Sequence, residues 1–230
     1  MRKSWGVLCL SAFVLCISSF SLQAQTDAAV SFYGAFNSPT NGDGTRQSPS
    51  NTAGGLFELR HVWNPLAGIE ATYSYNRANQ AYSSTFSPPC PVDSLCGPTT
   101  ITAGIPARAH EITADWVVSM RFANIRPFAL AGAGVLLNVP AAGSVTARET
   151  TCAIFNPLCS LTSVSISTST QIKAVYVYGA GLDWGIFPHV GLRFQYRGNL
   201  YKAPDLANTF SSTNSFTHNS EPMIGALFRF

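Results

Sequence analysis

The chain has 230 residues, of which 46% are hydrophobic and only 11% are charged, and its formal net charge is +3. This charge is too small, and the basic residues are too scattered, for a nucleic-acid-binding protein, and the length suits one domain. Beyond the amino terminus no apolar run reaches the about 20 residues that a transmembrane helix needs. The hydrophobic residues must therefore be distributed by alternation.

The amino terminus has the features of a secretory signal peptide. Arg2 and Lys3 precede an apolar run, and the small residue Ala24 ends the segment. We therefore predict a signal peptide at 1–24 and a single exported domain at 25–230.

Apolar and polar residues then alternate with a period of two, which is typical of strands that present different faces to different surroundings. The clearest strand has Ile112 and Trp116 on one face and Glu111 and Asp115 on the other. The predicted strands, in chain order, are 28–36, 54–63, 68–76, 110–122, 126–137, 171–184, 188–197 and 221–230.

The last strand has the pattern of the closing strand of a membrane barrel. Ile224 and Phe228 share the face of the terminal Phe230, and Leu227 and Arg229 lie on the other face. We expect the first face to meet lipid and the second to meet the lumen.

The connections between these strands alternate in length. Short turns are predicted at 64–66, 123–125 and 185–187, and long polar segments at 37–53, 77–109, 138–170 and 198–220. Outer-membrane barrels have this asymmetry, with short periplasmic turns and long external loops. We expect 37–51 to be a mobile loop and interpret the Ser/Thr-rich stretch 160–170 as an extension of the sixth strand.

Aromatic residues lie beside the short turns, where an interfacial belt is expected. The predicted belt residues are Trp63, Phe122, Phe128, Trp184, Phe187 and Phe230. The alternative is a soluble barrel with its two faces exchanged. That alternative is disfavoured, because the second face carries Gly, Ser and Thr with few charges, whereas soluble surfaces carry many Lys and Glu.

The chain resembles the OmpA-like family of eight-stranded outer-membrane barrels. It resembles those members that consist of the barrel without a peptidoglycan-binding domain. The resemblance covers the whole exported chain and rests on WNPLAGIEATYSY at 63–75, RPFALAGAG at 126–134, and YGAGLDW at 178–184 followed by GLRFQY at 191–196. It implies an all-β, antiparallel, up-and-down transmembrane barrel in the outer membrane of a Gram-negative-type bacterium. The family shares no catalytic residues, and its members anchor to the envelope, display loops, adhere, resist host factors or, in some cases, catalyse lipid chemistry.

Ten charged residues fall on predicted lumen faces, five of each sign. Balanced signs favour a salt-bridged plug, because a buried unpaired charge is costly. A role in proton transfer or substrate binding for Glu111 or Asp115 is the alternative. The predicted lumen network consists of Glu58, Arg60, Glu70, Glu111, Asp115, Arg121, Asp183, Arg193, Arg197 and Arg229.

Two histidines depart from the lumen pattern. His61 falls on the lipid face, which a local bulge or a position near the headgroups would explain, and it lacks partners for a metal site. His218 and Ser220, beside Glu221, invite comparison with lipid A deacylases, which hold such a dyad on a lipid-facing strand. We expect this pair at the end of a solvated loop instead, so we predict no catalytic, cofactor or metal site.

Four cysteines remain after signal removal. Cys90 and Cys96 lie in one predicted loop, and Cys152 and Cys159 lie in another. Disulfides persist in exported proteins, and the short, Pro-containing segments favour one local disulfide in each loop, although a bridge between the loops is the alternative.

The sequence thus predicts a monomeric, non-enzymatic barrel that anchors four external loops for a structural, adhesion or interaction role and has no open pore. A barrel-borne lipid hydrolase and a narrow solute channel are the alternatives. The expected partners are outer-membrane lipids, the barrel-assembly machinery, for which Phe230 is the expected signal, and an extracellular ligand of the loops.

Overall fold

The computed structural model describes residues 25–64, 66–87, 96–153 and 159–230, in which the chain forms a twelve-stranded antiparallel sheet. The predicted signal peptide lies outside these residues. Within the described ranges no helix is long and apolar enough to cross a membrane. The strands are β1 (Gln25–Asn37), β2 (Thr40–Gly42), β3 (Thr45–Pro49), β4 (Thr52–Asn64), β5 (Ala67–Phe86), β6 (Cys96–Ser119), β7 (Ile125–Pro140), β8 (Ser144–Ala153), β9 (Cys159–Ser167), β10 (Gln171–Gly185), β11 (Val190–Lys202) and β12 (Phe216–Arg229).

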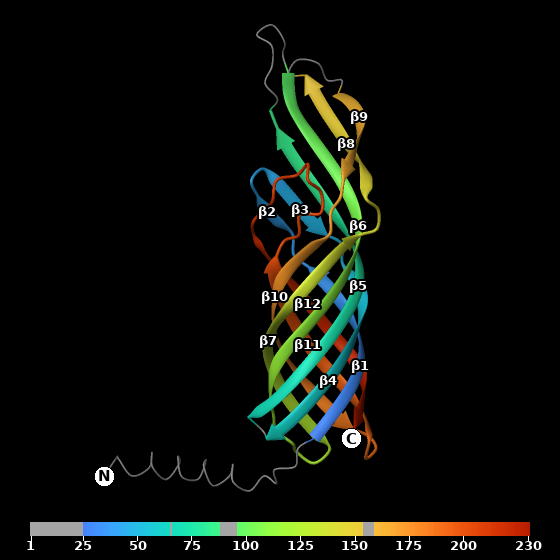
Figure 1. Ribbon diagram of the computed structural model, residues 1–230, viewed down its shortest axis with the longest axis vertical. Coiled ribbons are helices and arrows are strands. Elements are labelled where there is room, and N and C mark those ends of the chain that lie inside the picture. The colour runs from blue at the N-terminus through green and yellow to red at the C-terminus, as the bar shows by residue number, and fades with distance from the viewer. Residues whose placement is uncertain (1–24, 65, 88–95, 154–158) are drawn as a thin grey trace, which may run out of the picture.

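Eight of these strands form a closed ring (Figure 1). The order around the ring is β1, β4, β5, β6, β7, β10, β11 and β12, and β12 pairs with β1 to close it, with Gly225 opposite Ser31. Each ring strand is antiparallel to the next ring strand in the chain, so the predicted eight-stranded up-and-down barrel is confirmed. The predicted strand at 110–122 differs in its bounds, because β6 ends at Ser119 and begins at Cys96.

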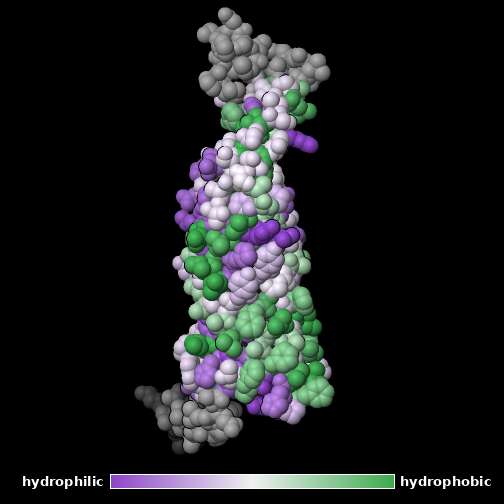
Figure 2. Space-filling model, turned by 45° about the vertical axis from the view of Figure 1, so that its right-hand side comes forward, coloured by the Kyte–Doolittle hydropathy of each residue, from purple (hydrophilic) through white to green (hydrophobic). Residues whose placement is uncertain are grey.

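Charged and apolar side chains occupy opposite faces of the ring. On β6, Ile112 and Trp116 are 58% and 53% exposed on the outside, whereas Glu111 and Asp115 are buried inside. The same division holds on β12, where Ile224 is exposed and Leu227 is buried. On the face shown in Figure 2, hydrophobic side chains are most frequent over the lower part of the molecule, and the upper part carries mostly intermediate and hydrophilic side chains with scattered hydrophobic ones.

Five of the six predicted belt aromatics lie exposed at the end of the ring that holds the short turns. They are Trp63, Phe122, Trp184, Phe187 and Phe230. The sixth assignment was wrong, because Phe128 is buried in the lumen. It lies close to a turn in sequence, but its place in the alternation of β7 points it inward.

The long external segments are largely built from strands, which corrects the prediction of loops. β5 and β6 remain paired from Gly68 opposite Val117 to Phe86 opposite Thr99. The β2–β3 hairpin pairs with β5 through 45–49, so the segment predicted to be mobile is part of the sheet. The β8–β9 hairpin pairs with β6, and the stretch predicted to extend the sixth strand belongs to β9 instead. We call these external strands the head.

The inner face of the head has its own hydrophobic core. Ile105 and Ile166 pack there with Leu206 and Phe210 from the segment between β11 and β12. The buried Tyr82 hydroxyl donates a hydrogen bond of 2.6 Å to the carbonyl of Pro204, and burial raises the pKa of this phenol. This core makes the head an ordered unit.

Candidate functional site

The lumen of the barrel holds a cluster of buried charged side chains, which we call the ionic plug. Every second residue of a strand faces inward, so ring strands with alternating charged residues must place them here. The plug consists of Asp27, Glu58, Arg60, Glu70, Glu111, Asp115, Arg126, Asp183, Arg193, Arg197, Glu221 and Arg229.

Arg193 on β11 lies at the centre of the plug. Its Nε donates to Oδ1 of Asp183 at 2.7 Å, and its Nη1 donates to Oε2 of Glu70 at 3.3 Å. The same Nη1 lies 3.4 Å from Oε1 of Glu58. One fully buried guanidinium therefore compensates carboxylates from three other strands.

Arg60 on β4 completes this layer. Its Nε donates to Oε2 of Glu70 at 2.6 Å, and its Nη1 donates to Oδ2 of Asp183 at 3.4 Å. The guanidinium carbon lies 3.9 Å from the centroid of the Phe128 ring, which gives a cation–π contact. Because the Phe128 side chain points into the lumen, its ring can stabilise the Arg60 guanidinium.

Three members of the plug were not predicted from the sequence: Asp27, Arg126 and Glu221. Arg126 pairs with Asp27 and donates from Nη2 to Oδ2 of Asp183 at 2.8 Å. Asp27 lies one residue before the predicted first strand. Arg126 begins a strand rich in Gly and Ala, although its spacing of two from Phe128 and four from Leu130 is a signal for the same face.

A second layer lies around Arg197. Its Nη2 donates to Oε1 of Glu111 at 3.1 Å and to Oγ1 of Thr113 at 2.8 Å, and it lies 3.7 Å from Oδ2 of Asp115. Nδ2 of Asn199 donates to the other oxygen of Glu111 at 3.1 Å. Both carboxylates that the sequence offered for proton transfer are thus buried and paired with the same guanidinium.

Arg121 was wrongly assigned to the lumen. It is exposed in the turn after β6, where its Nε donates to the carbonyl of Ala123 at 3.4 Å. Glu221 is buried inside the barrel and accepts a hydrogen bond of 2.6 Å from Asn219. The described plug therefore contains seven carboxylates and five guanidiniums, counting Arg229, rather than the five of each sign that were predicted.

This arrangement brings charged side chains from opposite walls of the ring together in its interior. The interior of an eight-stranded barrel is just wide enough for side chains to fill, and ion pairs between opposite walls cross the lumen in two layers. Among the described residues, no group of three or more His, Cys, Asp or Glu side chains is placed to hold a metal ion. The geometry is that of a structural plug.

The distribution of the two faces decides the class of barrel. A soluble barrel must turn its charged face to water, whereas here buried carboxylates and guanidiniums face inward and exposed Ile, Phe and Trp side chains face outward. This chain is an outer-membrane β-barrel. In such barrels the short turns lie at the periplasmic end and the long connections lie outside the cell, so we expect the head outside the cell and call the end with the short turns the periplasmic end.

No protein-family model and no curated protein sequence matches the chain. It is similar to the solved structure of Ail, the attachment invasion locus protein of Yersinia pestis, in complex with the heparin analogue sucrose octasulfate, with 17% identity, a TM-score of 0.46, and coverage of 90% of this chain and 99% of that chain. Neisserial surface protein A has 14% identity and a TM-score of 0.41 over 90% and 97% of the two chains. OprG from Pseudomonas aeruginosa has 10% identity and a TM-score of 0.47 over 90% and 96%.

His61 lies on the outer face near the periplasmic end. Its Nδ1 is 2.8 Å from Oγ1 of Thr26, its ring lies 5.1 Å from that of Trp63, and a register irregularity occurs between Val62 and Asn64. The imidazole thus lies beside a belt aromatic.

His218 and Ser220 lie on the outer face of β12, which corrects their predicted place in a loop. Oγ of Ser220 is 3.5 Å from Nδ1 of His218, while Nε2 of His218 is 2.8 Å from the hydroxyl of Tyr178. The adjacent Glu221 is buried on the opposite face. A hydrolytic triad needs an acid on the second imidazole nitrogen, and a phenol occupies that place.

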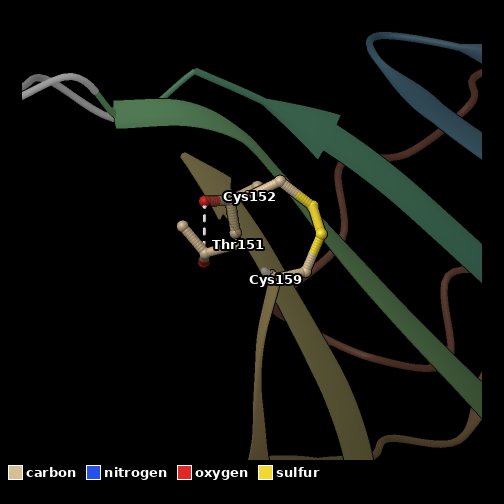
Figure 3. Close-up of a disulfide and its surroundings, with 4 residues drawn as sticks. Thr151, Cys152 and Cys159 are labelled. Atoms are coloured by element: carbon tan, nitrogen blue, oxygen red, sulfur yellow. Dashed lines mark hydrogen bonds between the residues drawn. A yellow bond between two sulfur atoms is a disulfide. The ribbon is translucent and has the colours of Figure 1, made fainter. Parts of the chain in front are cut away.

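The predicted pairing of Cys152 with Cys159 is confirmed. The disulfide joins β8 to β9 at positions that oppose each other in register (Figure 3). Cys90 lies outside the described residues, so its pairing with Cys96 stays a prediction.

Proposed function

We propose that the chain is a non-catalytic envelope protein whose sealed barrel holds an ordered head outside the cell for contact with an external surface. The observation that carries this proposal is the head itself. Its strands are held in register with the barrel, and its inner face is closed by Tyr82, Leu206 and Phe210. Ordered strands keep binding groups in fixed positions, which lowers the entropic cost of association.

The β8–β9 hairpin offers the sharpest test of this role. Replacing 144–167 by a short turn removes both disulfide cysteines together and leaves the pairing of the ring strands intact. We expect the variant to insert normally and to lose adhesion of cells to matrix-coated or epithelial surfaces. The matched control is Arg121→Ala at the periplasmic end, and equal adhesion of all three proteins would contradict the proposal.

A lipid hydrolase is the second candidate function, since Ser220 and His218 lie next to each other on the outer face of β12. We expect refolded protein to release no product from phospholipid or lipopolysaccharide, because His218 is bonded to a phenol instead of a carboxylate. The assay compares the wild-type protein with His218→Ala. Product that is formed by the wild type and lost in the variant would replace the non-catalytic assignment.

A further inference from the structure

The outer face of the sheet formed by β3, β5, β6 and β8 is basic and carries no acid among its described residues. Four exposed arginines lie on outward positions of these strands: Arg46, Arg77, Arg108 and Arg148. None of them forms an ion pair within the part of the chain that the structure describes, which distinguishes them from Arg60, Arg193 and Arg197 of the plug.

Two of these arginines lie directly opposite each other. Arg77 on β5 pairs in register with Arg108 on β6, and the next outward pair toward the membrane is Tyr75 with His110. Like charges directly opposite on neighbouring strands are destabilising unless a counter-charge lies between them. Nε of Arg77 donates to the hydroxyl of Tyr75 at 2.7 Å, which fixes the guanidinium beside its partner.

The position of this arginine pair along the barrel indicates that lipid phosphates supply the negative charge. Outward residues of β6 are apolar through Trp116 and Ile112 and become polar at His110 and Arg108. Tyr75 and Tyr73 lie at the same level on β5, and tyrosines are enriched where the barrel meets the headgroups. The arginine pair therefore lies at the level of the phosphates of the outer leaflet.

A groove of about 450 Å³ lies farther out on the same face, with Arg46 and Arg148 among its lining residues. These arginines belong to one row across the four strands, in which Arg46 opposes Ser83, Ser83 opposes Thr102, and Thr102 opposes Arg148. Three strand spacings separate them by about 14 Å, and the small residues Ala81 and Gly104 also line the groove. A sugar ring in the groove could therefore form hydrogen bonds with the hydroxyls of Ser83 and Thr102, and a guanidinium lies at either end of the row.

The two arginine pairs are separated by six residues on both β5 and β6, or about 20 Å along the strands. A glycolipid with phosphates at the membrane surface and anionic sugars extending outward matches this spacing, and guanidiniums bind phosphate through paired charged hydrogen bonds. We infer that this face binds one phosphorylated glycolipid of its own outer leaflet, a lipopolysaccharide, with its membrane-level phosphates at Arg77 and Arg108 and its core sugars in the groove. The inference rests on the barrel's place in the outer membrane and not on adhesion.

Full-length refolded barrel in phosphatidylcholine vesicles tests the inference, with fluorescent lipid A and fluorescent lipopolysaccharide of phosphorylated core as probes. We expect Arg77→Gln with Arg108→Gln to weaken binding of both probes by roughly ten-fold or more. We expect Arg46→Gln with Arg148→Gln to leave lipid A binding unchanged and to remove the tighter binding of lipopolysaccharide. Arg121→Gln is the matched control, because Arg121 is exposed at the periplasmic end.

Equal binding by both double variants, the control and the wild type would overturn the inference. A parallel binding assay with dextran sulfate, a soluble polyanion, tests whether the arginines bind an external polyanion instead of a glycolipid. If the Arg46 and Arg148 variant lost dextran sulfate binding but kept the full preference for lipopolysaccharide, the groove would belong to an external polyanion and the assignment would be wrong. Adhesion is tested with the hairpin deletion and glycolipid binding with the arginine variants, so failures of the two proposals are distinguishable.

Discussion

Arg193→Met is expected to lower the free energy of unfolding by about 3–5 kcal/mol, the cost of removing one partner from a buried ion pair. Methionine keeps much of the side-chain length but leaves Asp183, Glu70 and Glu58 without the guanidinium that joins them. All three carboxylates are buried in the lumen, where water cannot readily replace the lost partner. Urea titration of the refolded barrel in lipid vesicles measures the change.

Two companion variants isolate the charge effect. Arg121→Met removes an exposed arginine from a periplasmic turn and should change the urea midpoint very little. Adding Asp183→Asn to Arg193→Met removes the carboxylate closest to the lost guanidinium and should restore part of the stability. A loss below about 1 kcal/mol for Arg193→Met would show that the plug is hydrated and exchangeable.

Gly134→Val is also expected to lower the stability of the barrel strongly, because the new side chain would clash with the backbone of the neighbouring strand. A Cβ atom on Gly134 would lie 2.0 Å from the carbonyl oxygen of Ile112 and 2.7 Å from Cα of Thr113 on the paired strand β6. Neither atom can move without breaking the β6–β7 ladder, so we expect a loss of about 3 kcal/mol or more, or failure to fold. The heat-dependent shift in gel mobility of folded barrels gives the readout.

Ala133→Val is the matched control, since Ala133 is the preceding residue and its side chain is exposed on the outer face. The added methyl groups meet lipid there and should leave folding intact. Similar folded fractions for the Gly134 and Ala133 variants would contradict the close approach of β6 and β7.

The ring was predictable because lipid and lumen impose opposite demands on alternate residues. Where bulky apolar groups alternate with charges, as with Trp116 and Asp115, the sequence predicts both the strand and which of its faces turns to the lumen. The strand at 126–137 is different, because small Gly and Ala residues occur on both faces and hide the pattern. Arg126 was therefore missed, and Phe128 was placed by its nearness to a turn.

The head was not predictable in the same way, because water replaces lipid outside it. Its outer face needs only Ser, Thr and Arg, so the alternation is weaker, and prolines such as Pro106 read as loop residues. A signal remained in Ala103, Ile105 and Ala107, which alternate toward the inner core. The Arg46–Arg148 row depends on register between four strands, and no local pattern reports register.

Planar-bilayer recording of the wild-type protein tests the sealed barrel most directly. The two layers around Arg193 and Arg197 tie opposite walls of a ring that side chains can fill, so no continuous water column should cross it. A large porin, recorded separately in a bilayer of the same composition, is the positive control. The plug predicts no steady current from this protein at any applied voltage that leaves the bilayer intact. A steady, reproducible conductance from the wild-type barrel would contradict the plug and make the protein a narrow channel.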